Sequence, residues 1–196
     1  MRQLLLGAFF FAAVLPGCKS PEPSSPVPRA REEAALGRAR SAAQHLANTL
    51  RQRLSEAYGQ GGAARAVQVC AQEASDLTRE VAASTGVRVG RASLRLRNPA
   101  SAPPAWVGEW LRAQGERPAA GVTGVTRVEA TPQGRMARVL LPIAVDGLCV
   151  ACHGPQESLS GEVREILGRF YPRDQAVGYR PGDLRGAVWA EVAVKD

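Results

Sequence analysis

One short stretch constrains this chain more than any other, because the rest of the chain must fold around whatever the stretch binds. It reads Cys149-Val150-Ala151-Cys152-His153. Two thiols at this spacing can add across both vinyl groups of a haem, and the imidazole directly behind them can then bind the iron. The stretch therefore predicts one covalently attached haem c, with Cys149 and Cys152 as thioether positions and His153 as an iron ligand.

Two other kinds of chemistry use paired cysteines. A zinc site needs four nitrogen or sulfur ligands, and outside this stretch the chain offers only His45, Cys70 and Cys18, with no second paired motif. A dithiol redox pair has no use for a histidine directly behind its second cysteine. A metal site and a dithiol redox protein are therefore lesser alternatives to haem.

Residues 1–17 have the pattern of an export signal. One arginine precedes an apolar run from Leu4 to Val14, which is too short for a stable membrane span. Its end, Leu15-Pro16-Gly17-Cys18, resembles the bacterial lipoprotein signal, in which the cysteine is lipidated and becomes the new N-terminus. A plain signal peptide is the alternative. We expect a lipid-anchored protein that faces the periplasm, and Lys19, in place of an aspartate, favours the outer membrane by resemblance to the bacterial sorting rule.

Residues 18–30 are rich in proline and serine, a composition that prefers extended conformations and cannot bury a core. They predict a tether that leads to a single domain over residues 31–196. The whole chain carries a formal charge of +7, but its arginines are dispersed and only 5% of its residues are aromatic. We therefore expect no nucleic-acid partner, and contact with a membrane through the lipid anchor.

Apolar residues at three- and four-residue steps predict two long N-terminal helices, over residues 31–58 and 63–83, with a glycine-rich turn between them. Shorter helices are predicted after Pro103-Pro104 and over residues 157–170. Short β-like runs cover residues 87–96, 121–130, 136–145 and 186–194. This order predicts an α+β domain with a mostly antiparallel sheet.

Cys70 lies in the apolar stripe of the second predicted helix, in step with Val67, Ala74 and Leu77. A thiol there could be merely a small buried hydrophobe. However, an unpaired thiol in an oxidising compartment is a liability unless something protects or uses it. His45 lies on the polar face of the first helix, where we expect a solvated surface residue.

Four strings along the chain carry a resemblance to a known family. They run over residues 70–74, 90–99, 149–154 and 171–186, and the last begins Tyr171-Pro172-Arg173-Asp174. Together they resemble the Tll-like c-type haem family, whose members are exported haemoproteins or sensory domains of membrane signalling proteins. The resemblance spans residues 31–194. It implies a PAS-like sheet with flanking helices, one covalent haem, and a Cys/His axial pair with His153 proximal and Cys70 distal.

Three other candidates compete with Cys70 for the distal position: His45, Met136 and water. The polar helical face of His45 is unfavourable, and Arg135 and Arg138 beside Met136 indicate an edge or surface strand.

Arg91, Arg95 and Arg97 alternate along one predicted strand, so that all three side chains would share a face. On that face they would contact either the haem propionates or solvent.

We expect a protein without enzymatic activity, because a peroxidase would need a distal acid/base group and only His45 remains to supply one. Redox or gas sensing through a Cys/His-ligated haem is the expected role. Periplasmic electron transfer is the alternative. Either role requires a redox or signalling partner protein, which the sequence does not identify.

The lipid anchor gives a first testable prediction. Labelled fatty acid should enter the wild-type protein and should not enter Cys18→Ser, which should be recovered free in the periplasm because it lacks the acylated residue. Metabolic labelling and cell fractionation measure both. Equal labelling of the two proteins would show that Cys18 is not the anchor.

Overall fold

The computed structural model describes residues 26–115 and 117–195. The predicted signal peptide, Cys18 and residues 19–25 lie outside the described part of the chain. The α-helices are α1 (Pro26–Thr85), α2 (Ala105–Gln114), α3 (Val150–His153) and α4 (Gly161–Phe170). The strands are β1 (Arg88–Ala92), β2 (Val125–Thr131), β3 (Gly134–Ala144) and β4 (Leu184–Ala193). Three short 3-10 helices are η1 (Pro99–Ser101), η2 (Ala119–Gly121) and η3 (Gln156–Ser158).

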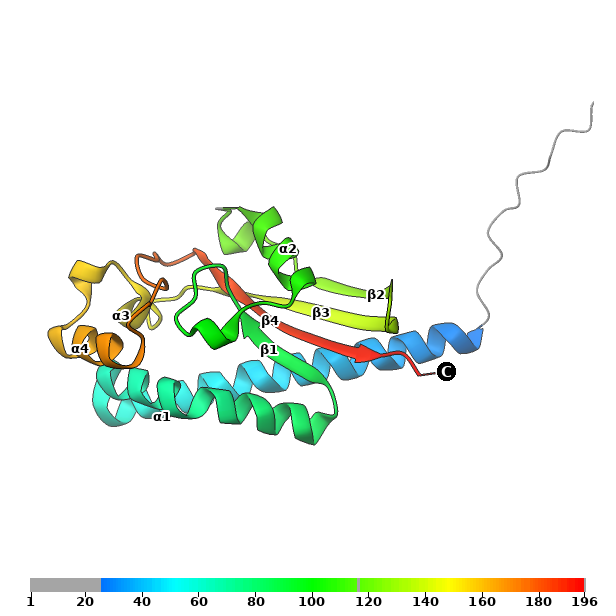
Figure 1. Cartoon of the computed structure of the whole chain (residues 1–196), viewed down its shortest axis with the longest axis horizontal. Coiled ribbons are helices and arrows are strands. Elements are labelled where there is room, and N and C mark those ends of the chain that lie inside the picture. Colours follow the sequence, from blue (N-terminus) through cyan, green and yellow to red (C-terminus); the bar gives the residue numbers. More distant parts are fainter. Residues whose placement is uncertain (1–25, 116, 196) are drawn as a thin grey trace, which may run out of the picture.

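The long element α1 consists of two helices joined at a sharp bend (Figure 1). Gly61 and Gly62 leave the helical region there, and Gly62 has φ of 64°, which glycine adopts without a steric penalty. The second half therefore runs back along the first. Arg53 and Glu73 connect the halves with an N–O distance of 2.6 Å. The prediction of two long N-terminal helices with a glycine turn between them is confirmed.

The start of α1 differs from the prediction. The helix begins at Pro26 and not at Arg31, so residues 26–30 of the predicted tether are helical. Proline is tolerated in the first turn of a helix because the backbone N–H groups there have no partner within the helix.

The four strands form one antiparallel sheet in the order β1-β4-β3-β2. Alternate side chains point to opposite faces, as the pleat requires. The face toward α1 buries a cluster that includes Leu46, Val81, Val89, Val139, Val188 and Ala190. The face toward α2 buries Ala92, Val107, Leu111, Leu140 and Ala187, with Trp106 and Trp189 packed against them. The predicted α+β class with a mostly antiparallel sheet is confirmed.

β1 is shorter than the predicted strand over residues 87–96, because it ends at Ala92. The hydroxyl oxygen of Ser93 accepts a hydrogen bond from the Arg95 backbone N–H at 3.2 Å. Such local bonds from serine compete with strand pairing. Only Arg91 of the three arginines therefore lies in a strand, and the prediction that Arg91, Arg95 and Arg97 alternate along one strand face is wrong.

The segment between β3 and β4 carries α3 and α4 and lies at one end of the sheet, beside the bend in α1 (Figure 1). α1 contacts both of these helices. The fold thus brings the stretch that contains His153 close to the helix half that contains Cys70. Within the described residues, no helix is both long enough and apolar enough to cross a membrane.

Candidate functional site

Asp146 holds the beginning of the paired-cysteine stretch. Its carboxylate accepts hydrogen bonds from the backbone N–H of Leu148 at 3.0 Å and of Cys149 at 3.1 Å. The Cys149 thiol also donates to this carboxylate at 3.1 Å, which is the main reason that the pKa of Asp146 is lowered. Arg51 of α1 pairs with Asp146 at 3.1 Å. Sequence reasoning missed this residue, although an aspartate just before a short helix is a recognisable capping signal.

His153 is the last residue of α3 and is half-buried. Its Nδ1 lies 2.7 Å from the backbone oxygen of Ala176. A carbonyl oxygen can only accept, so Nδ1 carries the hydrogen and Nε2 keeps its lone pair. Burial, together with the positive charges of Arg97 and Arg185, lowers the pKa of His153 to about 2. The ring is therefore neutral and oriented, as a metal-binding imidazole needs to be.

Arg97 connects the His153 turn to the loop after α4. Its Nε donates to the Asp174 carboxylate at 3.0 Å, and its Nη2 donates to the carbonyl of Ala176 at 3.1 Å and to that of Cys152. Asp174 in turn accepts from the backbone N–H of Ala176 at 2.7 Å. The Arg97 and Asp174 side chains are only 13% and 11% exposed. This buried pair fixes the carbonyl to which His153 donates.

Cys149 and Cys152 are free thiols in the structure. Burial raises the pKa of both, that of Cys152 to about 11. Redox-active cysteine pairs show the opposite direction, because the thiolate is their reactive form. The surroundings of this pair therefore do not favour the dithiol alternative.

Cys70 lies in the second half of α1 and is half-buried. Burial raises the pKa of its thiol, while the charges of Arg91 and Arg97 oppose that rise. The charge of Cys70 in turn contributes to the raised pKa of Cys152 and of Tyr171, since these groups lie close together. The structure thus gathers Cys70, Cys152 and Tyr171 around one space.

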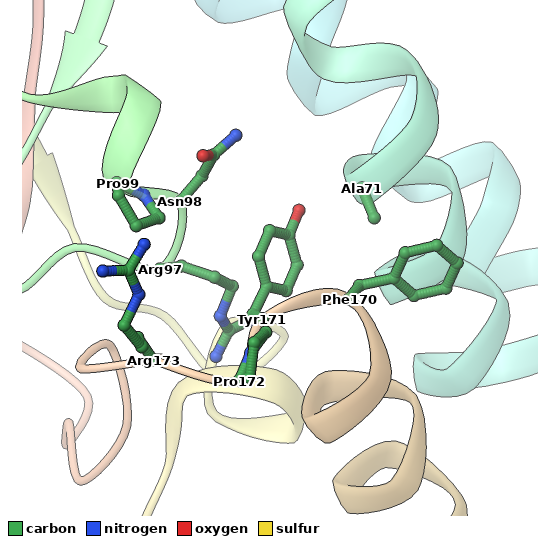
Figure 2. A pocket seen from close by; sticks show the side chains of 8 residues that line it. All are labelled: Ala71, Arg97, Asn98, Pro99, Phe170, Tyr171, Pro172 and Arg173. Atoms are coloured by element: carbon green, nitrogen blue, oxygen red, sulfur yellow. The ribbon is translucent and has the colours of Figure 1, made fainter.

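A cavity of about 270 Å³ opens close to the second half of α1, and its lining does not include Cys70 itself. Ala71, the next residue of α1, forms one wall, and the hydroxyl of Tyr171 points toward the space between Ala71 and Asn98 (Figure 2). Its lining residues are Ala71, Arg97, Asn98, Pro99, Phe170, Tyr171, Pro172 and Arg173. The cavity places open space at Ala71, one position along α1 from the predicted distal residue.

The structure does not bring the two rival side chains to this place. His45 is exposed and lines a shallow hollow on the polar face of α1. Met136 lies near the start of β3, whereas α3 follows the end of that strand. At about 3.3 Å per residue, the strand separates Met136 from the site by on the order of 25 Å.

The three predicted propionate partners have different surroundings. Arg97 is bound as described above, and Arg95 donates to the carbonyls of Gln175 at 3.1 Å and of Val177. Arg91 is exposed and makes no hydrogen bond or ion pair with another described residue. Arg91 therefore keeps a free guanidinium, whereas those of Arg95 and Arg97 are largely occupied. A propionate contact stays a prediction for all three.

Tyr179 is a further residue that sequence reasoning did not assign. Its ring meets that of His153 edge-on, with centroids 6.3 Å apart. The guanidinium carbons of Arg95 and Arg185 lie 4.4 and 5.2 Å from the centroid of the Tyr179 ring. Its backbone N–H donates to the carbonyl of His153 at 2.9 Å.

The donor groups fit a covalently attached haem better than a zinc ion. One neutral imidazole keeps a free nitrogen, two thiols precede it within about one helical turn, and the charge of a third thiol, that of Cys70, acts on one of these two. In residues 26–115 and 117–195, His, Cys, Asp and Glu form no group of three or more that could hold a metal ion. The zinc alternative therefore gains no support from the described residues.

The buried Arg97–Asp174 pair gives the second testable prediction. Asp174→Asn should lower the free energy of unfolding by about 3 kcal/mol, because it leaves the buried guanidinium without its counter-charge. Asp76→Asn is the matched control, since the Arg79–Asp76 pair is 75% and 59% exposed and should contribute less than about 1 kcal/mol. Urea unfolding measures both. Equal losses in the two variants would contradict the structural role of the buried pair.

Comparisons with known proteins identify the family and support the fold. The profile of the family described as Tll0287-like matches residues 28–193. A crystal structure described as the cyanobacterial heme-protein Tll0287 has a TM-score of 0.57 and 24% identity, over 77% of this chain and 92% of that chain. No curated protein matches. The family match covers most of the chain, and we conclude that the chain belongs to the Tll0287-like family.

Proposed function

We propose that this chain is a haem protein in which Cys149 and Cys152 hold one haem covalently and His153 supplies the proximal ligand. The observation that carries the proposal is the bond from His153 Nδ1 to the Ala176 carbonyl at 2.7 Å, which leaves Nε2 free beside two thiols. The similar crystal structure is described as that of a heme-protein, which supports the same function.

When bound, haem supplies an iron that changes valence and takes axial ligands. In the proposal, each thiol adds its sulfur and its hydrogen across one vinyl group, so that attachment needs no oxidant. Cys70 is the distal ligand, because it is a half-buried thiol on the opposing helix and no rival side chain is near. Burial raises the pKa of the Cys70 thiol, and the charges of Arg91 and Arg97 oppose that rise.

We propose redox or gas sensing as the role of the site. The cavity at Ala71, the residue after Cys70, supports this role, because it offers room for a small ligand near the proposed distal position. The proposal includes no enzymatic activity. The proposal also includes export, a lipid anchor at Cys18 and a separate protein partner. These three parts rest on the sequence alone.

Haem attachment is the third testable prediction. Protein made with a c-type maturation system should keep its haem through acid-acetone extraction and give the pyridine haemochrome of two thioethers. Cys149→Ala and Cys152→Ala should each give the spectrum of one thioether, and the double variant should release its haem, because each thiol forms one bond. Cys70→Ala is the control and should retain the haem. A colourless wild-type protein, or haem that extracts freely, would refute the proposal.

The distal ligand is the fourth testable prediction. Cys70→Ala should change the ferric spectrum from low-spin to largely high-spin and raise the reduction potential, because a thiolate donates charge to ferric iron. Absorption spectra and a redox titration measure both changes. His45→Ala is the matched control and should leave both unchanged, since His45 is exposed and remote. A low-spin spectrum in Cys70→Ala would make Cys70 a core thiol only.

The same titration separates sensing from electron transfer. A sensor of this design loosens the cysteine on reduction and then binds CO or NO, which gives it two states. An electron-transfer protein keeps both axial ligands in both valences. A reduced wild-type protein that stays low-spin and binds neither gas would favour electron transfer.

A further inference from the structure

Arg185, near the start of β4, is a half-buried cation without a counter-charge. Its Nη1 donates to the Arg95 carbonyl at 3.3 Å, and its guanidinium carbon lies 5.2 Å from the centroid of the Tyr179 ring. It forms no ion pair with any other described residue. Burial, and the charges of Arg97 and Arg91, lower the pKa of Arg185.

The surroundings of Arg185 contain more positive charge than negative charge. Arg91, Arg97 and Arg185 all act on His153, and Arg95 lies on the same Tyr179 ring as Arg185. The carboxylate whose charge reaches Arg185 is that of Asp174, which is already bound to Arg97 at 3.0 Å. A half-buried guanidinium without a counter-charge is costly, so this arrangement calls for a further anion.

Arg91 is the second arginine without a partner at this place. It pairs in register with Val188 of β4, close along that strand to Arg185. The antiparallel pairing of β1 and β4 therefore places Arg91 and Arg185 near one end of these strands, and the charge of Arg91 acts on Arg185. Two arginines suit carboxylates better than lysines do, because each guanidinium can donate two parallel hydrogen bonds.

We propose that Arg185 and Arg91 bind carboxylate groups beside His153, and that these carboxylates are the propionates of the covalently attached haem. This inference rests on the proposed function and deepens it. The sequence predicted propionate contacts for Arg91, Arg95 and Arg97. The inference keeps Arg91 from this set and makes Arg185 the main contact. Arg95 and Arg97 instead shape the loop that holds His153 in place.

The test uses the holoprotein and four variants: Arg185→Gln, Arg185→Lys, Arg91→Gln and the control Arg180→Gln. Arg180 is exposed and lies in the loop that leads into β4. The propionate bending bands in the resonance Raman spectrum should shift in Arg185→Gln and Arg91→Gln, should shift less in Arg185→Lys, and should stay unchanged in Arg180→Gln. The reduction potential should fall in the two shifted glutamine variants, because a nearby cation favours the more negative reduced state.

Three outcomes would contradict the inference. Unshifted propionate bands in both Arg185→Gln and Arg91→Gln, with haem attached, overturn it and leave the proposed function intact. Arg91 is exposed, so Arg91→Gln decides the matter if Arg185→Gln does not fold. If added acetate raises the melting temperature of the wild type but not of Arg185→Gln, while the bands stay unshifted, the arginines bind a free anion and the inference is wrong. A wild type without covalent haem overturns the proposed function together with it.

Discussion

The carbonyl oxygen of Ala176 is the point on which the candidate site depends. It accepts from His153 Nδ1 at 2.7 Å and from Arg97 at 3.1 Å, so one backbone group fixes both the tautomer of the imidazole and the position of a buried guanidinium. Asp174 secures that carbonyl from the other side, because it pairs with Arg97 and accepts from the Ala176 N–H at 2.7 Å. If Ala176 moved, His153 would lose its orientation and Arg97 would lose part of its hydrogen bonding.

The same arrangement makes the site electrically positive. Arg97 is balanced by Asp174, whereas Arg91 and Arg185 are not balanced by any described carboxylate. Burial together with this field keeps His153 neutral, and the field opposes the rise that burial imposes on the pKa of Cys70. Both effects favour the protonation states that iron ligation needs, a neutral imidazole and an anionic sulfur. A group that brings its own carboxylates would also relieve the excess positive charge.

The sequence predicts those parts of the fold that depend on residues close together in the chain. It does not predict contacts between residues far apart in the chain. The bend at Gly61 and Gly62, the helices and the alternating strands follow from local pattern, as does the spacing of Cys149, Cys152 and His153. The strand that ends at Ala92 was predicted too long because apolar alternation continues after a serine that bonds locally. The pairing of Arg97 with Asp174 joins residues separated by 77 positions, so no local pattern indicates it. Arg185 was missed for the same reason, since its lack of a partner becomes visible only in three dimensions.

The bend in α1 also decides how an event at Cys70 would be transmitted. Glu73 lies on the same face of the helix as Cys70, because residues three positions apart are neighbours on a helical surface. Its carboxylate binds Arg53 of the first half at 2.6 Å, and its charge acts on Cys70. The first half in turn packs through Leu46 and Ala43 on the sheet. Movement of the Cys70 helix would therefore act on the Arg53–Glu73 pair. This pair connects the two halves of α1 together with the apolar contacts that Ala66 and Val69 make with Ala57 and Leu54.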